Sequence, residues 1–139
     1  MRGKFVVLLS GLLLVSLIGV GCGGYTELEF REPLDTIEMD LVGPRMLEPS
    51  EITLDRPGTY AVKVENVADS NTTHALEITS TEGSKVNYKE GSVRSPDLSP
   101  GVSAPEFKVH LEPGTYEIYC PVGEHREQGM RGTLTVEEG

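Results

Sequence analysis

The sequence predicts an all-β protein, a two-sheet Greek-key β-sandwich. Apolar and polar residues alternate with a period of two along the body of the chain, and no stretch of any length carries a helical apolar stripe. Gly, Pro, Ser and Asp interrupt the alternation at short intervals, as they do in turns between short strands. Seven strands are expected, a number that suits a sandwich: 36–42, 51–54, 59–67, 74–79, 106–111, 115–120 and 131–136.

The first 21 residues are typical of an export signal. Arg2 and Lys4 precede an apolar or small-residue run over 5–20, which is shorter than the about 20 apolar residues that a spanning helix needs. The run ends in the sequence GVGCGG, which resembles a bacterial or archaeal lipoprotein cleavage site and implies that Cys22 carries a lipid. The alternatives are ordinary signal-peptidase cleavage near the same place and an uncleaved anchor.

Three segments follow from this interpretation: a signal peptide over 1–21, a flexible tether over 22–33 and one folded domain over 34–139. Removal of the first segment takes away two bases and no acid, so the formal charge changes from −10 to −12. This acidity argues against binding of nucleic acid and against binding of an anionic membrane by charge. The chain that remains after removal of residues 1–21, about 115 residues, is large enough to bury roughly two-thirds of its unfolded surface without disulfides.

Two short segments of similar sequence mark turns that start strands. Both contain Pro-Gly-Thr-Tyr, at 57–60 and at 113–116, and Pro-Gly is a strong turn signal. Between the strands at 74–79 and 106–111, the stretch 82–105 contains Ser, Gly and Pro throughout. We expect it to be a long irregular crossover within the domain.

The three histidines are sorted by strand parity, because alternate residues of a strand face opposite sides of a sheet. His110 shares its face with Lys108, opposite an apolar set, and is predicted to be a solvated surface residue. His74 shares its face with Leu76 and Ile78, and is predicted to point inward at the end of a strand.

The loop before the last strand places Cys120, His125 and Met130 at even five-residue steps. Cys120 ends one inward-facing row, Met130 begins another, and His125 lies in the loop between them. Taken singly, these are a buried free cysteine, a gap-filling methionine and a histidine, all common in cores. With His74 they supply one thiolate, two imidazoles and one thioether, the set that a His2Cys copper site with a weak axial Met requires. A lipidated Cys22 also leaves Cys120 unpaired, which favours a metal-binding or reactive role.

At these residues the chain resembles the cupredoxins, or type 1 blue copper proteins, the group of plastocyanin, halocyanin, rusticyanin and sulfocyanin. The resemblance extends from about Glu48 to the end, and is strongest over 98–101 and over "LEPGTYEIYCPVGEHREQGMRGTLTV". Tyr116, four residues before the cysteine, resembles the structural tyrosine-corner residue of the family. By matching position, the resemblance implies a cupredoxin-like fold and one copper ion, Cu(I) or Cu(II), bound by His74, Cys120, His125 and Met130.

The chain departs from the family near the expected metal ligands. Relatives commonly have Asn after the first ligand histidine and Ser or Thr after the cysteine, and these side chains tie the two ligand loops together. Ala75 and Pro121 occupy these positions, so that tie is absent. Pro121 also lacks an N–H group, although those of Ala75 and Val122 remain available to the sulfur. Glu124 stands before the loop histidine where many relatives have Gly, which predicts a partly polar docking patch.

The leading hypothesis is a monomeric type 1 copper protein that carries single electrons between redox partners. We expect it to be exported and tethered through its N-terminus at the outer, periplasmic or extracellular, face of the cytoplasmic membrane. Its acidity favours cationic partners such as a basic cytochrome, and an oxidase is another candidate partner. A copper chaperone or storage protein with the same ligands is the alternative, although the sequence has no Met-rich or His-rich tail.

No enzyme activity is expected. Multicopper oxidases and nitrite reductases need further His-x-His pairs or a second copper site, and a binuclear copper site needs a second cysteine in the loop. A nucleophilic pair of Cys120 and His125 would need an exposed thiol, whereas Cys120 ends an inward-facing row. A Greek-key adhesion or assembly domain without a ligand is the remaining alternative.

Overall fold

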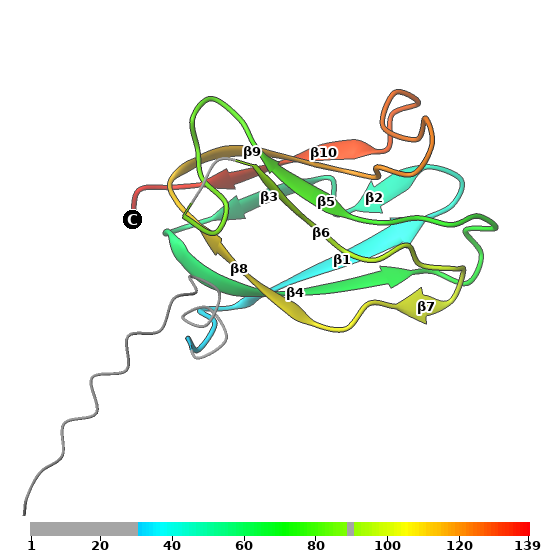
Figure 1. Cartoon of the computed structure of the whole chain (residues 1–139), viewed down its shortest axis with the longest axis horizontal. Helices are drawn as coiled ribbons and strands as arrows, with labels where there is room; N and C mark the ends of the chain where they lie inside the picture. Colours follow the sequence, from blue (N-terminus) through cyan, green and yellow to red (C-terminus); the bar gives the residue numbers. More distant parts are fainter. Residues whose placement is uncertain (1–30, 89–90) are drawn as a thin grey trace, which may run out of the picture.

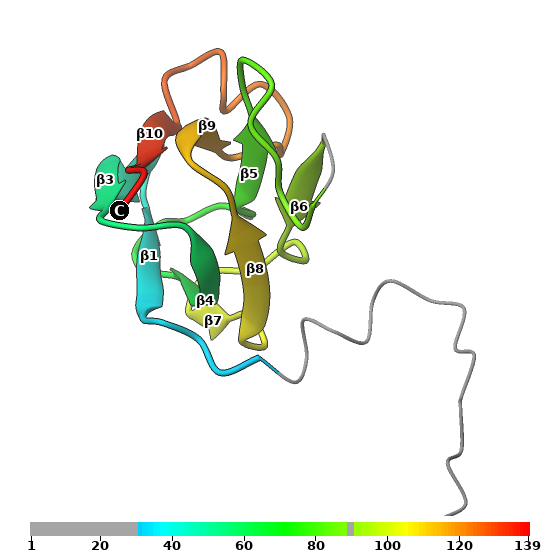
Figure 2. The same cartoon turned by 90° about the vertical axis from the view of Figure 1, so that its left-hand side faces the viewer.

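The computed structural model describes residues 31–88 and 91–139. The predicted signal peptide, Cys22 and most of the predicted tether lie outside these residues. Two sheets of five strands each face one another (Figures 1 and 2), which confirms the predicted all-β sandwich. None of the described residues forms a helix long and apolar enough to cross a membrane.

One sheet has the order β2-β1-β4-β7, and β8 also pairs with β4; the other has the order β3-β10-β9-β5-β6. The pairs β1/β4 and β3/β10 are parallel, and the other pairs are antiparallel. The strands within the described part are β1 (Thr36–Val42), β2 (Met46–Glu48), β3 (Glu51–Leu54), β4 (Gly58–Asn66), β5 (Glu77–Ser80), β6 (Ser92–Arg94), β7 (Val102–Ser103), β8 (Phe107–Leu111), β9 (Gly114–Tyr119) and β10 (Arg131–Val136).

Strands with clear alternation were predicted within one residue at each end, and the two Pro-Gly turns do start strands, at Gly58 and Gly114. Seven strands were predicted, whereas the described residues contain ten; β2 is one of the three that were missed. Two predictions about particular segments were also wrong. The stretch 82–105 contains two short strands, β6 and β7, which are too short to show a period. The strand predicted over 74–79 begins only at Glu77, because His74 pairs through a single bridge to Leu98 instead of a continuous ladder.

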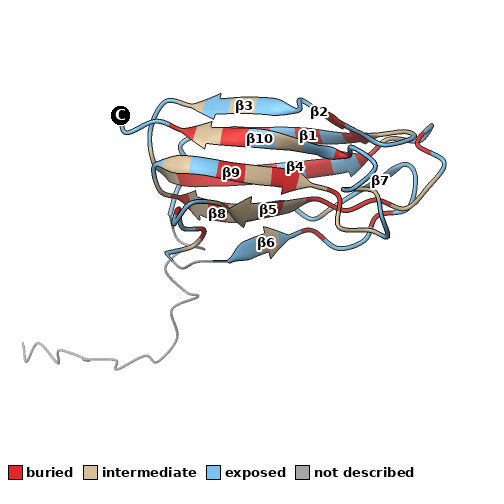
Figure 3. Cartoon of the chain, turned by 90° about the horizontal axis from the view of Figure 1, so that it is seen from above, coloured by how far each residue is buried: buried red, intermediate tan, exposed pale blue. Residues whose placement is uncertain are grey.

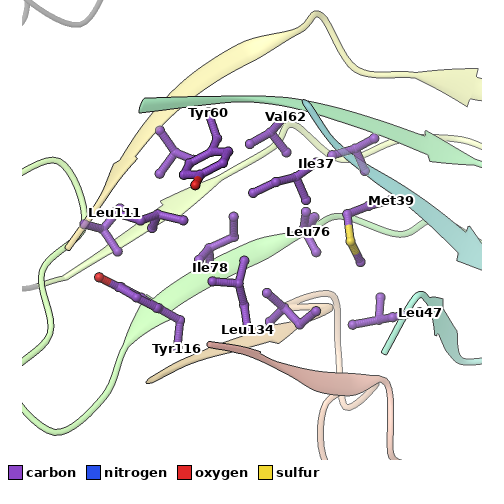
Figure 4. Close-up of a cluster of buried hydrophobic side chains, with 14 of the residues drawn as sticks. Ile37, Met39, Leu47, Tyr60, Val62, Leu76, Ile78, Leu111, Tyr116 and Leu134 are labelled. Atoms are coloured by element: carbon purple, nitrogen blue, oxygen red, sulfur yellow. The ribbon is translucent and has the colours of Figure 1, made fainter. Parts of the chain in front are cut away.

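The inward-facing residues of both sheets form one hydrophobic core (Figures 3 and 4). Two tyrosines within it are almost completely buried, and the hydroxyl of each donates to the carbonyl four residues upstream. Tyr60 donates to Arg56 at 2.7 Å, and Tyr116 donates to Glu112 at 2.7 Å and to Lys85 at 2.9 Å. The similar segments of the sequence therefore build two similar corners, with the geometry of a tyrosine corner. Buried phenols with their hydroxyls paired stabilise both turns.

His110 was predicted to be a solvated surface residue, but the structure shows a half-buried imidazole. The ring of Tyr88 stacks on it with centroids 4.1 Å apart and planes 18° apart. Its Nδ1 lies 3.3 Å from Thr59 Oγ1 on β4. Strand parity did place His110 on the outer face, but Tyr88, whose backbone is left-handed (φ 65°), covers that face. Burial, followed by the positive charge of Arg31, lowers the pKa of His110.

The lowered pKa of His110 predicts that its protonation opposes folding. An unfolded histidine titrates near about pH 6.5, so between that pH and the folded pKa the unfolded chain binds more protons. The free energy of unfolding should therefore fall as the pH decreases from 7.5 to 5.5, and His110→Gln should lose less of it than the wild type. Urea unfolding at both pH values measures this difference. Equal losses in the two proteins would contradict it.

Candidate metal centre

Three side chains at one end of the sandwich bring one sulfur and two nitrogen atoms together. His74 lies in the connection from β4 to β5, Cys120 directly follows β9, and His125 lies in the loop from β9 to β10; both connections are at the right-hand end of Figure 1. The two Nδ1 atoms are 3.2 Å apart, and Cys120 Sγ lies 3.4 Å from the Nδ1 of His125 and 3.7 Å from that of His74. Among the described residues, these three form the one cluster of His, Cys, Asp and Glu that fits a metal ion.

The size of this triangle fits one transition-metal ion. A circle through three points with these separations has a radius of about 2.0 Å, so one position lies about 2.0 Å from all three atoms. Protein metal sites have metal–nitrogen distances of about 2.0–2.1 Å and metal–sulfur distances of about 2.3 Å. An ion at this position would lie within bonding distance of all three atoms.

His74 is completely buried, and its backbone is fixed by Leu98. Its N–H donates to Leu98 O at 3.1 Å, and the Leu98 N–H donates to its carbonyl at 2.7 Å. Burial, followed by the positive charges of His125 and Arg45, lowers the pKa of His74. A lowered pKa favours the neutral imidazole, which is the form that binds a metal. The strand prediction placed His74 inward correctly, although the residue lies outside β5.

Backbone hydrogen bonds connect the three predicted ligands of the last loop. Cys120 N donates to Met130 O at 3.0 Å, and Met130 N donates to His125 O at 2.9 Å. Cys120 and Met130 are fully buried, whereas His125 is half-buried. The structure therefore brings Met130 beside the cluster through the backbone. Its role as a weak fourth ligand stays a prediction.

Arg126 fastens the loop to the strand that leads to Cys120. Its Nε donates to Glu117 Oε1 at 3.0 Å, its Nη2 contacts Glu117 Oε2, and its guanidinium lies 4.3 Å from the ring centroid of Tyr119. A two-point contact fixes the direction of the side chain as well as its distance. Sequence reasoning missed this clamp, because a spacing of nine residues across a turn carries no local signal.

The residues that replace the loop tie of relatives also lie beside the cluster. Ala75 is fully buried directly after His74, and Pro121 is half-buried directly after Cys120. Val122 packs against the hydrophobic core. None of these three side chains can form the polar bridge that the resemblance describes, and donation from the Ala75 and Val122 amides to the sulfur stays a prediction.

Comparisons with known proteins show which fold this is. No protein-family model matches the chain, and no curated protein matches it. Solved structures that match include auracyanin B, with a TM-score of 0.61 and 18% identity over 76% of this chain and 91% of that chain. The chain has the cupredoxin fold. The predicted fold class, including its cupredoxin-like character, is thereby confirmed.

Two further solved structures share this cupredoxin fold. Na-dithionite-reduced auracyanin from the photosynthetic bacterium Roseiflexus castenholzii has a TM-score of 0.61 and 22% identity, over 76% of this chain and 98% of that chain. Auracyanin A is described as a "blue" copper protein from the green thermophilic photosynthetic bacterium Chloroflexus aurantiacus. It has a TM-score of 0.59 and 20% identity, over 76% of this chain and all of that chain.

The Arg126 clamp predicts a measurable change in the last loop. Arg126→Met removes both contacts with Glu117, so the loop should open more often, and the amide of Met130 should exchange its hydrogen faster. Lys63→Met is the matched control, because Lys63 is also an exposed cation beside carboxylates, with Glu38 at 3.9 Å. Hydrogen exchange on the metal-free protein measures the difference. Equal exchange rates of the Met130 amide in Arg126→Met and Lys63→Met would contradict a role of Arg126 in holding the loop.

Proposed function

We propose that the protein binds one copper ion through His74, Cys120 and His125, with Met130 as a weak fourth ligand, and carries single electrons between redox partners. The observation that carries the proposal is the convergence of one thiol and two imidazole nitrogens at the distances of a single metal ion. A mixed set of one thiolate, two imidazoles and a thioether suits copper better than the hard cations Mg²⁺ and Ca²⁺. A "blue" copper protein with the same fold supports this choice.

The chain supplies a rigid and largely dry frame for this chemistry. When bound, copper would accept or release one electron between Cu(II) and Cu(I). Cys120 directly follows β9 and Met130 directly precedes β10. Both residues are fully buried, and the two strands pair over six residues, which fixes where each side chain starts. His125 is the ligand that reaches partial exposure, and we propose its ring as the route by which an electron leaves.

The partner side of the proposal is supported by an acidic row on the outer face of one sheet. Asp40 on β1 lies opposite Glu48 on β2 and opposite Glu65 on β4, and all three are exposed. Adjacent like charges attract a cationic surface and speed its approach. We therefore propose a basic redox protein, such as a cytochrome or an oxidase with a cationic face, as partner of a monomeric carrier that is not an enzyme.

We also propose the location that the sequence indicates: export by residues 1–21, a lipid on Cys22, a tether over 22–33 and the domain 34–139 at the outer face of the cytoplasmic membrane. An apolar run after two positive charges and a cysteine between small residues support this location. A tether would hold the domain within reach of membrane-bound partners.

The copper site is tested by adding Cu(II) to the purified full chain and recording the visible spectrum. One equivalent should give an intense thiolate-to-copper charge-transfer band that a one-electron reductant bleaches reversibly. Cys120→Ala should abolish the band, and His110→Gln, at a histidine outside the cluster, should keep it. A colourless copper complex, or a band that survives Cys120→Ala, would exclude this kind of site.

The acidic row is tested by electron transfer to a basic cytochrome. Asp40→Asn combined with Glu65→Gln should lower the second-order rate constant by about 3–10-fold at low salt and flatten its dependence on ionic strength. Glu82→Asn combined with Glu138→Gln removes the same charge elsewhere on the surface, and should change the rate constant much less. Stopped-flow mixing at several salt concentrations measures both. Equal effects of the two double variants would show that net charge alone matters.

A further inference from the structure

We infer that Asn66 is a positioning residue of the metal centre, and that its side-chain amide fixes the place of His74 through two backbone carbonyls. The inference rests on the proposed function, because it concerns the same ligand. Asn66 would then supply a buried polar side chain that holds the segment around His74. The side chains of Ala75 and Pro121 have no polar group that could do so.

Asn66 is the last residue of β4 and is completely buried. Its Nδ2 donates at 2.8 Å to Thr72 O and at 2.8 Å to Leu98 O. Thr72 lies two residues before His74, and Leu98 exchanges two backbone hydrogen bonds with His74. One amide group therefore holds both the segment that leads into the ligand and the segment that pairs with it.

This arrangement requires two donors on one short side chain. An asparagine amide has two N–H donors, a hydroxyl has one, and a carboxylate would place oxygen against both carbonyls. The same two carbonyls fix the orientation of the amide, because the opposite orientation would bring oxygen against oxygen. Asn66 Oδ1 has no hydrogen-bond partner among the described residues. Burying an unpaired acceptor costs free energy, so any stabilisation by Asn66 must come from its two donated hydrogen bonds.

The ring of His74 gains little orientation from its own second nitrogen. Metal-binding histidines usually donate this second N–H to a carboxylate, a carbonyl or water. The Nε2 of His74 is buried and has no hydrogen-bond partner within residues 31–88 and 91–139. The position of Nδ1 must then be set by packing and by the backbone of His74, and that backbone is held by Leu98 and, through Leu98, by Asn66.

A structural effect and a positioning effect can be separated by a matched control. The hydroxyl of Tyr116 also donates to two backbone carbonyls, those of Lys85 and Glu112. It lies four residues before Cys120 in the chain, about 13 Å along β9. Tyr116→Phe therefore removes two donated hydrogen bonds at a distance from the cluster. Asn66→Leu removes the same number of donated bonds from the segments that carry and pair with His74.

The test compares copper binding by Asn66→Leu, Tyr116→Phe and the wild type, with thermal unfolding of the metal-free proteins alongside. Both variants should unfold at lower temperature. Asn66→Leu should weaken Cu(II) binding by about 10–100-fold and shift the charge-transfer band, whereas Tyr116→Phe should keep the affinity and the band of the wild type. Wild-type affinity and band in a folded Asn66→Leu would overturn the inference.

Two further measurements keep the test decisive. If Asn66→Leu does not fold, Asn66→Ser, which retains one donor, replaces it. A loss of copper affinity in Asn66→Ser would support the inference, and wild-type affinity would overturn it. In the metal-free proteins, the amides of His74 and Leu98 should exchange faster in the folded Asn66 variant but not in Tyr116→Phe. If the wild type shows no thiolate-to-copper charge-transfer band, the proposed function is refuted. The hydrogen-exchange measurement needs no metal, so it would still report whether Asn66 holds His74.

Discussion

The proposed metal centre depends on a few backbone hydrogen bonds made where the regular ladders end. His74 is held by its bridge to Leu98, and Cys120 and His125 are each joined to Met130 by one bond. The three candidate ligand atoms of these residues lie 3.2–3.7 Å apart. The remainder of the sandwich serves to keep the ends of β4, β9 and β10 in place, so that the bonds form in one geometry.

Two kinds of side chain reinforce this end of the molecule, and they act from different sides. Arg126 contacts Glu117 at the surface, where salt and water weaken an ion pair, and the two-point contact sets the direction of its side chain. Asn66 acts in the interior, where a hydrogen bond is stronger because few competing partners are present. Asn66 holds the segment that contains His74, and Arg126 holds the loop that contains His125. Ala75 and Pro121 cannot join these two segments through their side chains.

The sequence was informative where packing follows a simple period. Alternation predicted the long strands and the inward direction of His74 and Cys120, because one face of each strand must be buried. It failed for β2, β6 and β7, which have too few residues to show a period. It also failed for His110, because Tyr88 covers that residue from another segment of the chain. Asn66 donates to carbonyls that are 6 and 32 residues away in the sequence, and no local sequence pattern predicts these contacts.

The short outermost strands have a consequence for encounters between copies of the protein. β2 and β6 have three residues each, β3 has four, and β7 and β8, which share one side of β4, have two and five. An exposed sheet edge is a template for intermolecular strand addition, and short edges offer little of it. Copies of the protein at high concentration can therefore approach one another without the sheet of one molecule extending into the next.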